Sequence, residues 1–152
     1  MKIRAHHLLC LLGFQGLGYS PDFIRRMAET RKALDEGQEF EIEVVEECDD
    51  ICPACPYFSE LECRKGKFSA RRTREMDGKV LKTLGLKRGE TLNSSLVIPL
   101  IRERLGEFPL LVKICGRCGW REVCTYYVDL RESWRKKLFR RNPFPKHSRA
   151  GG

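Results

Sequence analysis

Residues 115–124 read Cys-Gly-Arg-Cys-Gly-Trp-Arg-Glu-Val-Cys, and residues 52–63 carry three cysteines at a similar spacing. Each stretch has two cysteines separated by two residues and a third cysteine further along. A turn of this kind brings two sulfurs close enough to bind one metal ion, with metal–sulfur bonds of about 2.3 Å. The duplicated pattern therefore predicts that metal is bound by two triads of cysteines: Cys52, Cys55 and Cys63, and Cys115, Cys118 and Cys124.

Each triad is one ligand short, because zinc sites and cubane iron–sulfur clusters usually take four. The remaining cysteines are Cys10 and Cys48. Cys48 precedes Cys52 by four residues, so we assign Cys48 to the first triad and Cys10 to the second. His6 and His7 share a helical face with Cys10, and we expect one of them to donate to a sulfur or to act as an alternative ligand. Two other readings of Cys10 are a free thiol activated by imidazolium and a buried small apolar residue.

Spacing alone separates zinc from iron poorly. The C-x2-C-x5-C spacing of the second triad resembles the last three ligands of the cluster loop in the endonuclease-III and adenine-glycosylase family, whose first ligand would fall here on Phe108. Cys55-Pro56 resembles the Cys-Pro of bacterial ferredoxins. These local resemblances favour an iron–sulfur cluster, with 4Fe-4S preferred, and zinc is the alternative. A thioredoxin-like redox pair at Cys52 and Cys55 is a rival reading, but Pro56 argues against the helix that it needs.

The chain has 152 residues, enough for one domain with a hydrophobic core, so its eight cysteines are not needed as disulfide staples. The apolar run from Leu8 to Phe14 is too short to span a membrane, and the histidines before it are unlike a signal peptide. We therefore expect a cytoplasmic protein without membrane contact, in which clustered cysteines bind metal. The scarcity of amide side chains is typical of thermophiles, so disulfides stay an alternative.

Hydrophobic periodicity predicts a mainly helical α+β fold with a small β element. Ser20 and Pro21 are typical of a helix start, and Thr91 or Ser94 is the expected cap of a later helix. The expected helices cover residues 4–13, 21–36, 77–84, 95–105 and 125–139, and the expected strand covers 39–46. We predict a single metal-stabilised domain over residues 1–140 and a basic, flexible tail over 141–152.

From Arg131 onward, eight Lys or Arg stand against one acidic residue, Glu132. A segment of this charge can contact nucleic acid or an acidic partner, whereas the plain alternative is a solvated helix end. The basic stretch 64–74 is a second candidate surface. The candidate nucleic-acid contacts in the tail region are Arg135, Lys136, Lys137, Arg140 and Arg141.

Three blocks, RAHHLLCLLGFQGLGYSPDF (4–23), DDICPACP (49–56) and CGRCGWREVC (115–124), are similar to a family of small uncharacterised archaeal and bacterial proteins, domain of unknown function 1284. The resemblance implies a cytoplasmic prokaryotic protein that binds an iron–sulfur cluster, and it implies no particular reaction or enzyme class. The expected function is an iron–sulfur protein with a redox or cluster-assisted role and an unidentified redox or protein partner. The alternative is a zinc-stabilised module that binds nucleic acid or protein.

Overall fold

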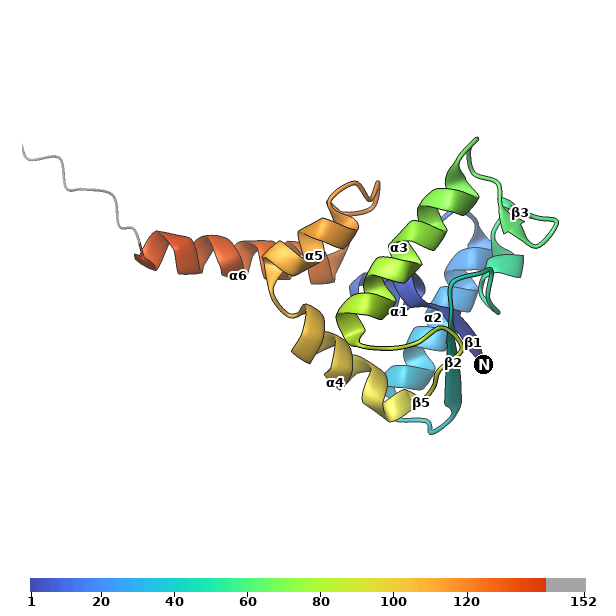
Figure 1. The fold of residues 1–152 in the computed structure, drawn as a ribbon, viewed down its shortest axis with the longest axis horizontal. Coiled ribbons are helices and arrows are strands. Elements are labelled where there is room, and N and C mark those ends of the chain that lie inside the picture. Colours follow the sequence, from blue (N-terminus) through green and yellow to red (C-terminus); the bar gives the residue numbers. More distant parts are fainter. Residues whose placement is uncertain (142–152) are drawn as a thin grey trace, which may run out of the picture.

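Helix α1 (Ala5–Gly13) lies among the other helices in the computed structural model, which describes residues 1–141 (Figure 1). It contacts helices α2, α3, α4 and α6. A helix that is apolar on all sides is stable only when other elements surround it. The four leucines of α1 meet this condition because all are buried: Leu8, Leu9, Leu11 and Leu12.

A small sheet holds the start of this helix. Strand β1 (Lys2–Arg4) runs parallel to β2 (Glu41–Val45), and β5 (Thr91–Asn93) pairs antiparallel with the other edge of β2. Ile3 lies opposite Val44, and both are fully buried. The prediction of a strand at β2 is confirmed. Strands β1 and β5 were not predicted because three residues are too few to show an alternating pattern.

Helix α2 (Pro21–Asp35) begins as the sequence predicts. The Ser20 hydroxyl accepts a hydrogen bond from the Phe23 backbone N–H at 3.1 Å, and Pro21 occupies the first turn. Phe23, Met27 and Leu34 form its buried face. The helix ends at Asp35. At its start, the capping residue Ser20 also holds the first cysteine loop beside α2, because the Ser20 hydroxyl donates to the Ala54 carbonyl at 3.2 Å.

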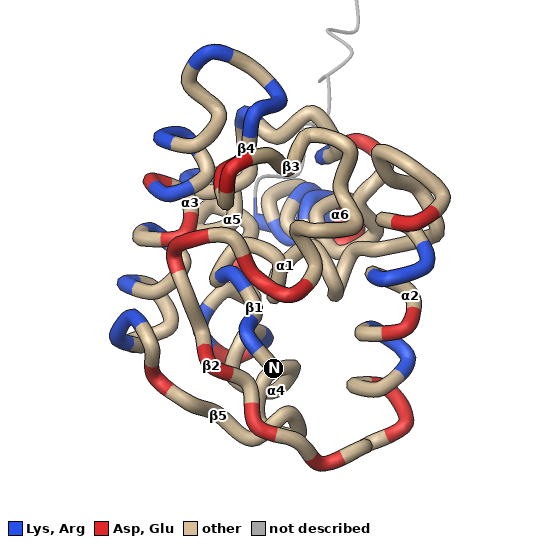
Figure 2. The backbone as a smooth tube through the Cα atoms, turned by 90° about the vertical axis from the view of Figure 1, so that its right-hand side faces the viewer, with Lys and Arg blue, Asp and Glu red and all other residues tan. Residues whose placement is uncertain are grey.

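Helix α3 (Ser69–Leu84) starts eight residues before the predicted helix. The reason is that its first two turns are exposed and basic, so they lack the apolar period that marks a packed helix. Figure 2 shows Lys and Arg along the outer side of α3 and on the loop before it. The second half packs through Val80, Leu81 and Leu84. Gly85, with φ of 73°, ends the helix in the left-handed conformation that glycine adopts without strain.

Helices α4 (Ser94–Leu105) and α5 (Phe108–Cys115) form a pair before the second cysteine loop. The cap of α4 is Asn93 rather than the expected Thr91 or Ser94, because the Asn93 side chain accepts from the Ser95 N–H at 2.9 Å. Helix α5 was not predicted, since Pro109 at its start and Gly116 after its end leave only eight residues. It ends at Cys115 and thereby sets the position of the second loop.

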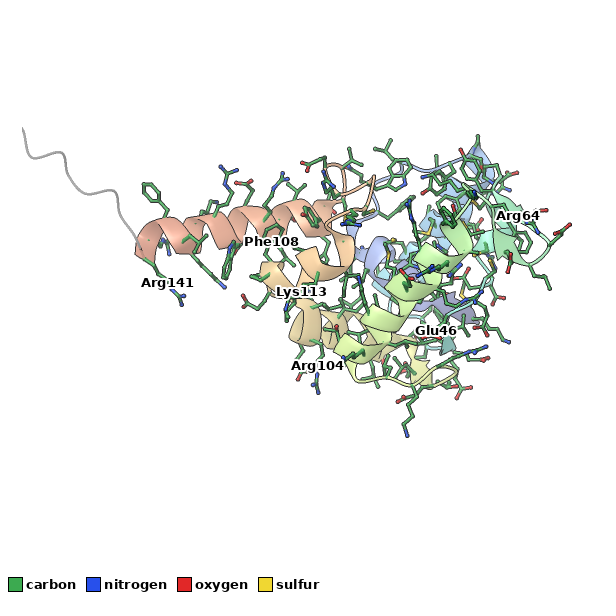
Figure 3. The ribbon with its side chains drawn as sticks, turned by 45° about the horizontal axis from the view of Figure 1, so that its top comes forward. Glu46, Arg64, Arg104, Phe108, Lys113 and Arg141 are labelled. Carbon is green, nitrogen blue, oxygen red and sulfur yellow. The ribbon has the colours of Figure 1, made fainter. Side chains whose placement is uncertain are left out.

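Helix α6 (Thr125–Arg141) packs on α1 and α5, and its C-terminal part extends away from the other helices (Figure 1). Arg141, at its end, and Arg64, in the first cysteine loop, lie at opposite ends of the molecule in Figure 3. Only Tyr127 of this helix is buried. The expectation of a flexible tail concerns residues that, apart from Arg141, lie outside the described range. Within residues 1–141, none of the helices combines the length and the apolarity needed to cross a bilayer. The mainly helical class is confirmed.

Candidate metal centres

Four cysteines from distant parts of the chain come together between α1, α5 and α6, and we call them the second set: Cys10, Cys115, Cys118 and Cys124. Burial and the nearby thiols of Cys118, Cys115 and Cys124 raise the pKa of the Cys10 thiol well above its ordinary value. Burial, with Cys118 and Cys124, raises the pKa of Cys115 to about 12. Thiols that repel each other's charge in this way are neighbours.

Local backbone geometry presents the sulfurs of the second set. The Cys118 N–H donates to the Cys115 carbonyl at 2.9 Å and closes the turn. The Trp120 N–H donates to the Cys118 sulfur at 3.4 Å. Cys124 immediately precedes α6, so its sulfur accepts from the N–H groups of Tyr127 and Tyr126, which oppose the rise in its pKa caused by burial. A helix N-terminus favours a thiolate in this position.

The first set of cysteines surrounds the short helical turn η1 (Cys52–Ala54) and the hairpin of β3 (Phe58–Ser59) and β4 (Glu62–Cys63). The Cys55 N–H donates to the Cys52 carbonyl at 2.8 Å and closes this turn too. Burial raises the pKa values of Cys48, Cys52 and Cys55. Cys63 interacts electrostatically with both Cys48 and Cys55. The first set is therefore Cys48, Cys52, Cys55 and Cys63.

Asp49 organises the start of the first loop. Its Oδ2 accepts from the Arg4 backbone N–H and contacts His7 Nδ1, both at 2.7 Å. Its Oδ1 accepts from the N–H groups of Ile51 and Cys52, at 2.9 and 3.0 Å. Burial alone would raise the pKa of this carboxyl, but His7 and the hydrogen bonds outweigh burial and hold the pKa below its usual range.

His7, Asp49 and Cys52 form a group that could hold a metal ion, because each offers a ligand atom within 4.8 Å of the others. However, the Asp49 carboxylate already has four partners, which fill its acceptor sites. The geometry therefore fits Asp49 better as a brace for the turn that carries Cys52 than as a ligand.

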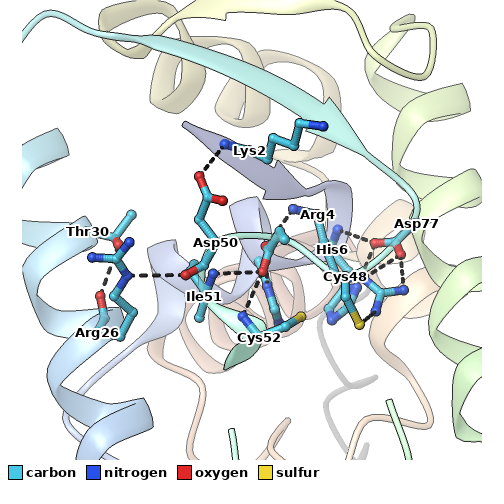
Figure 4. Close-up of polar contacts among 12 residues, drawn as sticks. Lys2, Arg4, His6, Arg26, Thr30, Cys48, Asp50, Ile51, Cys52 and Asp77 are labelled. Carbon is cyan, nitrogen blue, oxygen red and sulfur yellow. Dashed lines mark hydrogen bonds and ion pairs between the residues drawn. The ribbon is translucent and has the colours of Figure 1, made fainter. Parts of the chain in front are cut away.

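A buried ionic network joins α1, α3 and the first set (Figure 4). Arg4 donates through Nε and NH2 to Asp77 Oδ2 at 2.9 and 2.6 Å, and the His6 backbone N–H and Nδ1 contact Asp77 Oδ1 at 2.9 and 2.6 Å. The Arg4 NH1 group also reaches the Cys48 sulfur at 3.7 Å. Although burial lowers the pKa of Arg4, the interaction with Asp77 raises it by more, so the guanidinium stays charged.

The surroundings of His6, His7 and Cys10 differ from the expected histidine–sulfur contact and from the alternative of an activated Cys10 thiol. Both imidazoles direct Nδ1 at a carboxylate, His6 at Asp77 and His7 at Asp49, rather than at a sulfur. Burial and then the charge of His7 lower the pKa of His6, which disfavours an imidazolium beside Cys10. The raised pKa of Cys10 is likewise opposite to that of an activated thiol. All eight cysteines are free thiols in the structure.

Sequence reasoning missed three residues that position the two sets: Arg4, Asp49 and Asp77. Only Asp49 carried a signal, as an acidic residue beside Cys48 in the Asp-Asp-Ile-Cys block. The candidate nucleic-acid contacts all lie on the exposed part of α6, where Lys137 pairs with Glu107 at 3.7 Å and Arg135 with Glu132 at 3.6 Å.

The sequence model of one family matches residues 18–124, and that family is described as protein of unknown function (DUF1284). The matched region contains both cysteine loops and every cysteine except Cys10. No curated protein and no solved structure matches the chain.

Proposed function

The chain belongs to the DUF1284 family of proteins of unknown function, and we propose that it is a cytoplasmic iron–sulfur protein with two centres, each held by one set of four cysteines. The observation that carries the proposal is the grouping of the eight cysteines. Cys10 lies more than 100 residues before the other members of its set, yet it interacts with all three. Four cysteine ligands are the usual complement of a 4Fe-4S cluster.

Two features of the sequence favour a cluster over a single zinc ion. The C-x2-C-x5-C spacing of Cys115, Cys118 and Cys124 resembles part of a known cluster loop, and Cys55-Pro56 resembles the Cys-Pro of bacterial ferredoxins. Four cysteines also suit tetrahedral zinc, so metal analysis distinguishes the two.

The surroundings of both sets suit thiolate ligands. Backbone N–H groups donate to the sulfurs of Cys118 and Cys124, and the Arg4 guanidinium reaches Cys48. Hydrogen bonds and positive charge near the sulfurs offset the negative charge of a thiolate-bound centre and tune its reduction potential. An iron–sulfur cluster supplies one-electron chemistry. We propose a redox or cluster-assisted role with an unidentified partner.

Anaerobic purification with analysis of iron, acid-labile sulfide and zinc tests the proposal. Two 4Fe-4S clusters would give about eight iron and eight sulfide per chain and a brown protein that bleaches on reduction. Apo-protein reconstituted with iron and sulfide should reach the same values. About two zinc per chain, with no sulfide and no uptake of iron on reconstitution, would contradict it.

A zinc-stabilised module that binds nucleic acid is the second candidate, and the position of α6 favours it. The last turns of this helix project from the domain (Figure 1), and they carry the exposed residues Arg135, Lys136, Lys137, Arg140 and Arg141. A projecting basic helix end can enter a groove of nucleic acid and contact phosphates. This role concerns a different surface from the cysteines, so metal analysis and binding measurements test the two candidates separately.

A further inference from the structure

The two cysteine loops share a feature beyond their ligands. Each has an aromatic residue two positions after the second cysteine of the C-x-x-C pair, Tyr57 after Cys55 and Trp120 after Cys118. The backbone N–H of Tyr57 donates to the Cys55 sulfur, and that of Trp120 donates to the Cys118 sulfur. The two aromatic residues are therefore equivalent: each is hydrogen-bonded through its backbone to a predicted ligand and free to use its ring elsewhere.

Both rings pack on the same residue, Tyr19. The Tyr19 ring lies 5.3 Å from the ring of Tyr57 and 5.3 Å from that of Trp120, with edge-on angles of 80° and 73°. The Trp120 Nε1–H donates to the Tyr19 hydroxyl at 2.9 Å. Edge-to-face aromatic pairs are worth about 0.5–1.5 kcal/mol each beyond the area they bury. Tyr19 thus connects the first loop to the second.

Lys65 reinforces the same junction. Its Nζ donates to the Tyr19 hydroxyl at 3.1 Å, so this oxygen accepts from both cysteine loops with its two lone pairs. The positive charge of Lys65 also interacts with Cys55 of the first set and with Cys118 of the second. One side chain therefore binds Tyr19 and acts electrostatically on a cysteine of each set.

Tyr19 itself is held in place from its own segment. The neighbouring Ser20 hydroxyl donates to the Ala54 carbonyl inside the first C-x-x-C turn, and the Tyr19 ring packs on Phe23 of α2 at 5.4 Å. The contacts of its own segment therefore hold Tyr19 in position between the two loops.

We infer that Tyr19 is a positioning residue that joins the two cysteine loops through Tyr57, Trp120 and Lys65, so that the two metal centres form one coupled pair. The inference rests on the proposed function, because coupling requires that both sets hold a redox centre. Within such a pair one electron can be exchanged inside the chain, with one centre oxidised as the other is reduced. No separate electron carrier is needed for that exchange.

A reductive titration of the anaerobic wild-type protein, followed by electron paramagnetic resonance, tests the pairing without any variant. Two reduced centres close together broaden and split each other's signals, because the magnetic interaction falls steeply with distance. We expect a simple spectrum while one centre is reduced and a broadened, split spectrum when both are. A fully reduced spectrum that is the plain sum of two independent signals, in protein containing both clusters, would overturn the inference and leave the proposed function intact.

Tyr19 variants test the positioning role. Tyr19→Ala removes the ring and the hydroxyl. We expect its iron content to differ from that of the wild-type protein by no more than about a fifth, whereas the splitting of the resonance signal is lost. Tyr19→Phe keeps the ring contacts and should retain most of the splitting, which is the rescue expected of a positioning residue. Thr83→Val is the control, since it removes a hydroxyl whose hydrogen bond to the Lys79 carbonyl lies within α3.

The outcomes separate the two proposals. Protein with no iron and sulfide after reconstitution would refute the proposed function itself. If Tyr19→Ala fails to fold or loses its iron, Trp120→Phe still weakens the junction, because it removes the Nε1–H that donates to the Tyr19 hydroxyl, and it should reduce the splitting measurably. Unchanged splitting in Trp120→Phe, with both clusters present, would remove Tyr19 from the positioning role.

Discussion

The Cys124 sulfur lies against the backbone of Gly13, where any other residue would place its Cβ: a Cβ built at Gly13 would be 2.0 Å from Cys124 Sγ. Gly13 ends the helix that carries Cys10, so this close approach brings two members of the second set together. The absence of a side chain at Gly13 is therefore a condition for the second set to form.

Gly13→Ala should displace Cys124 and disable the second set while sparing the first. We expect bound iron to fall to about half of wild type, measured after anaerobic reconstitution. Gly119→Ala is the matched control, because a Cβ at Gly119 meets nothing within 4 Å. Full iron content in Gly13→Ala would show that Cys124 does not need its present position.

Serine substitutions should show that the two sets are separate. Cys55→Ser and Cys118→Ser are each expected to lose about half of the iron and sulfide, because each removes one ligand from a different set. The double variant should lose nearly all of both. Loss of all iron in either single variant, with the fold retained by circular dichroism, would instead indicate one shared centre.

The accessibility of Cys10 reports on its role as a ligand. In the metal-loaded protein we expect Cys10 to resist a thiol-alkylating reagent, and to be labelled only after chelation under anaerobic conditions. Peptide mass spectrometry identifies the labelled cysteine. Rapid labelling of Cys10 before chelation would contradict its assignment to the second set.

Asp77→Asn should destabilise the fold strongly. Asp77 is fully buried and pairs with Arg4 and His6, so its replacement leaves the Arg4 guanidinium without its charged partner. Breaking a buried ion pair on one side costs about 3–5 kcal/mol. Urea unfolding followed by circular dichroism measures the free energy of unfolding.

Glu75→Gln, on the same helix, serves as the comparison for Asp77→Asn. It breaks the exposed ion pair with Arg71 and should change the free energy of unfolding by less than about 1 kcal/mol. Similar losses in the two variants would mean that the buried network has no special part in stability.

Charge reversal on α6 tests the nucleic-acid alternative. Lys136→Glu with Arg140→Glu should abolish binding of a fluorescent duplex oligonucleotide if this helix contacts phosphates, and the wild-type affinity should fall steeply with added salt. Fluorescence anisotropy measures both effects. Equal affinities of variant and wild type would assign any binding to another surface.

Much of the framework was predictable because it depends on local patterns. The cap at Ser20 and Pro21 marks the start of α2, and the apolar run of α1 marks a buried helix. The short elements were not predictable, since β1 and β5 are defined by their pairing with β2 rather than by their own residues. The basic start of α3 is similar: an exposed helix face carries little hydrophobic pattern.

The candidate site was also predictable only in part. The C-x-x-C pairs are visible in the sequence, and the grouping of Cys10 with the second loop followed from the count of ligands. The neighbours that hold the cysteines come from distant segments, and their pairing needed the fold. Asp77 lies 71 residues after His6, and nothing in the residues around Asp77 distinguishes it from an ordinary exposed aspartate.

The long separation between Cys10 and Cys124 has a consequence for biosynthesis. A ribosome releases the chain from its N-terminus, so the first set is complete once residue 63 has emerged, whereas Cys10 must wait for about the next sixty residues before its own partners exist. Throughout that interval Cys10 lacks the other three members of its set, although α2, and then α3 and α4, become available to pack on α1. Assembly of the two proposed centres would therefore be ordered by translation, with Cys10 an unligated thiol until the second cysteine loop has been made.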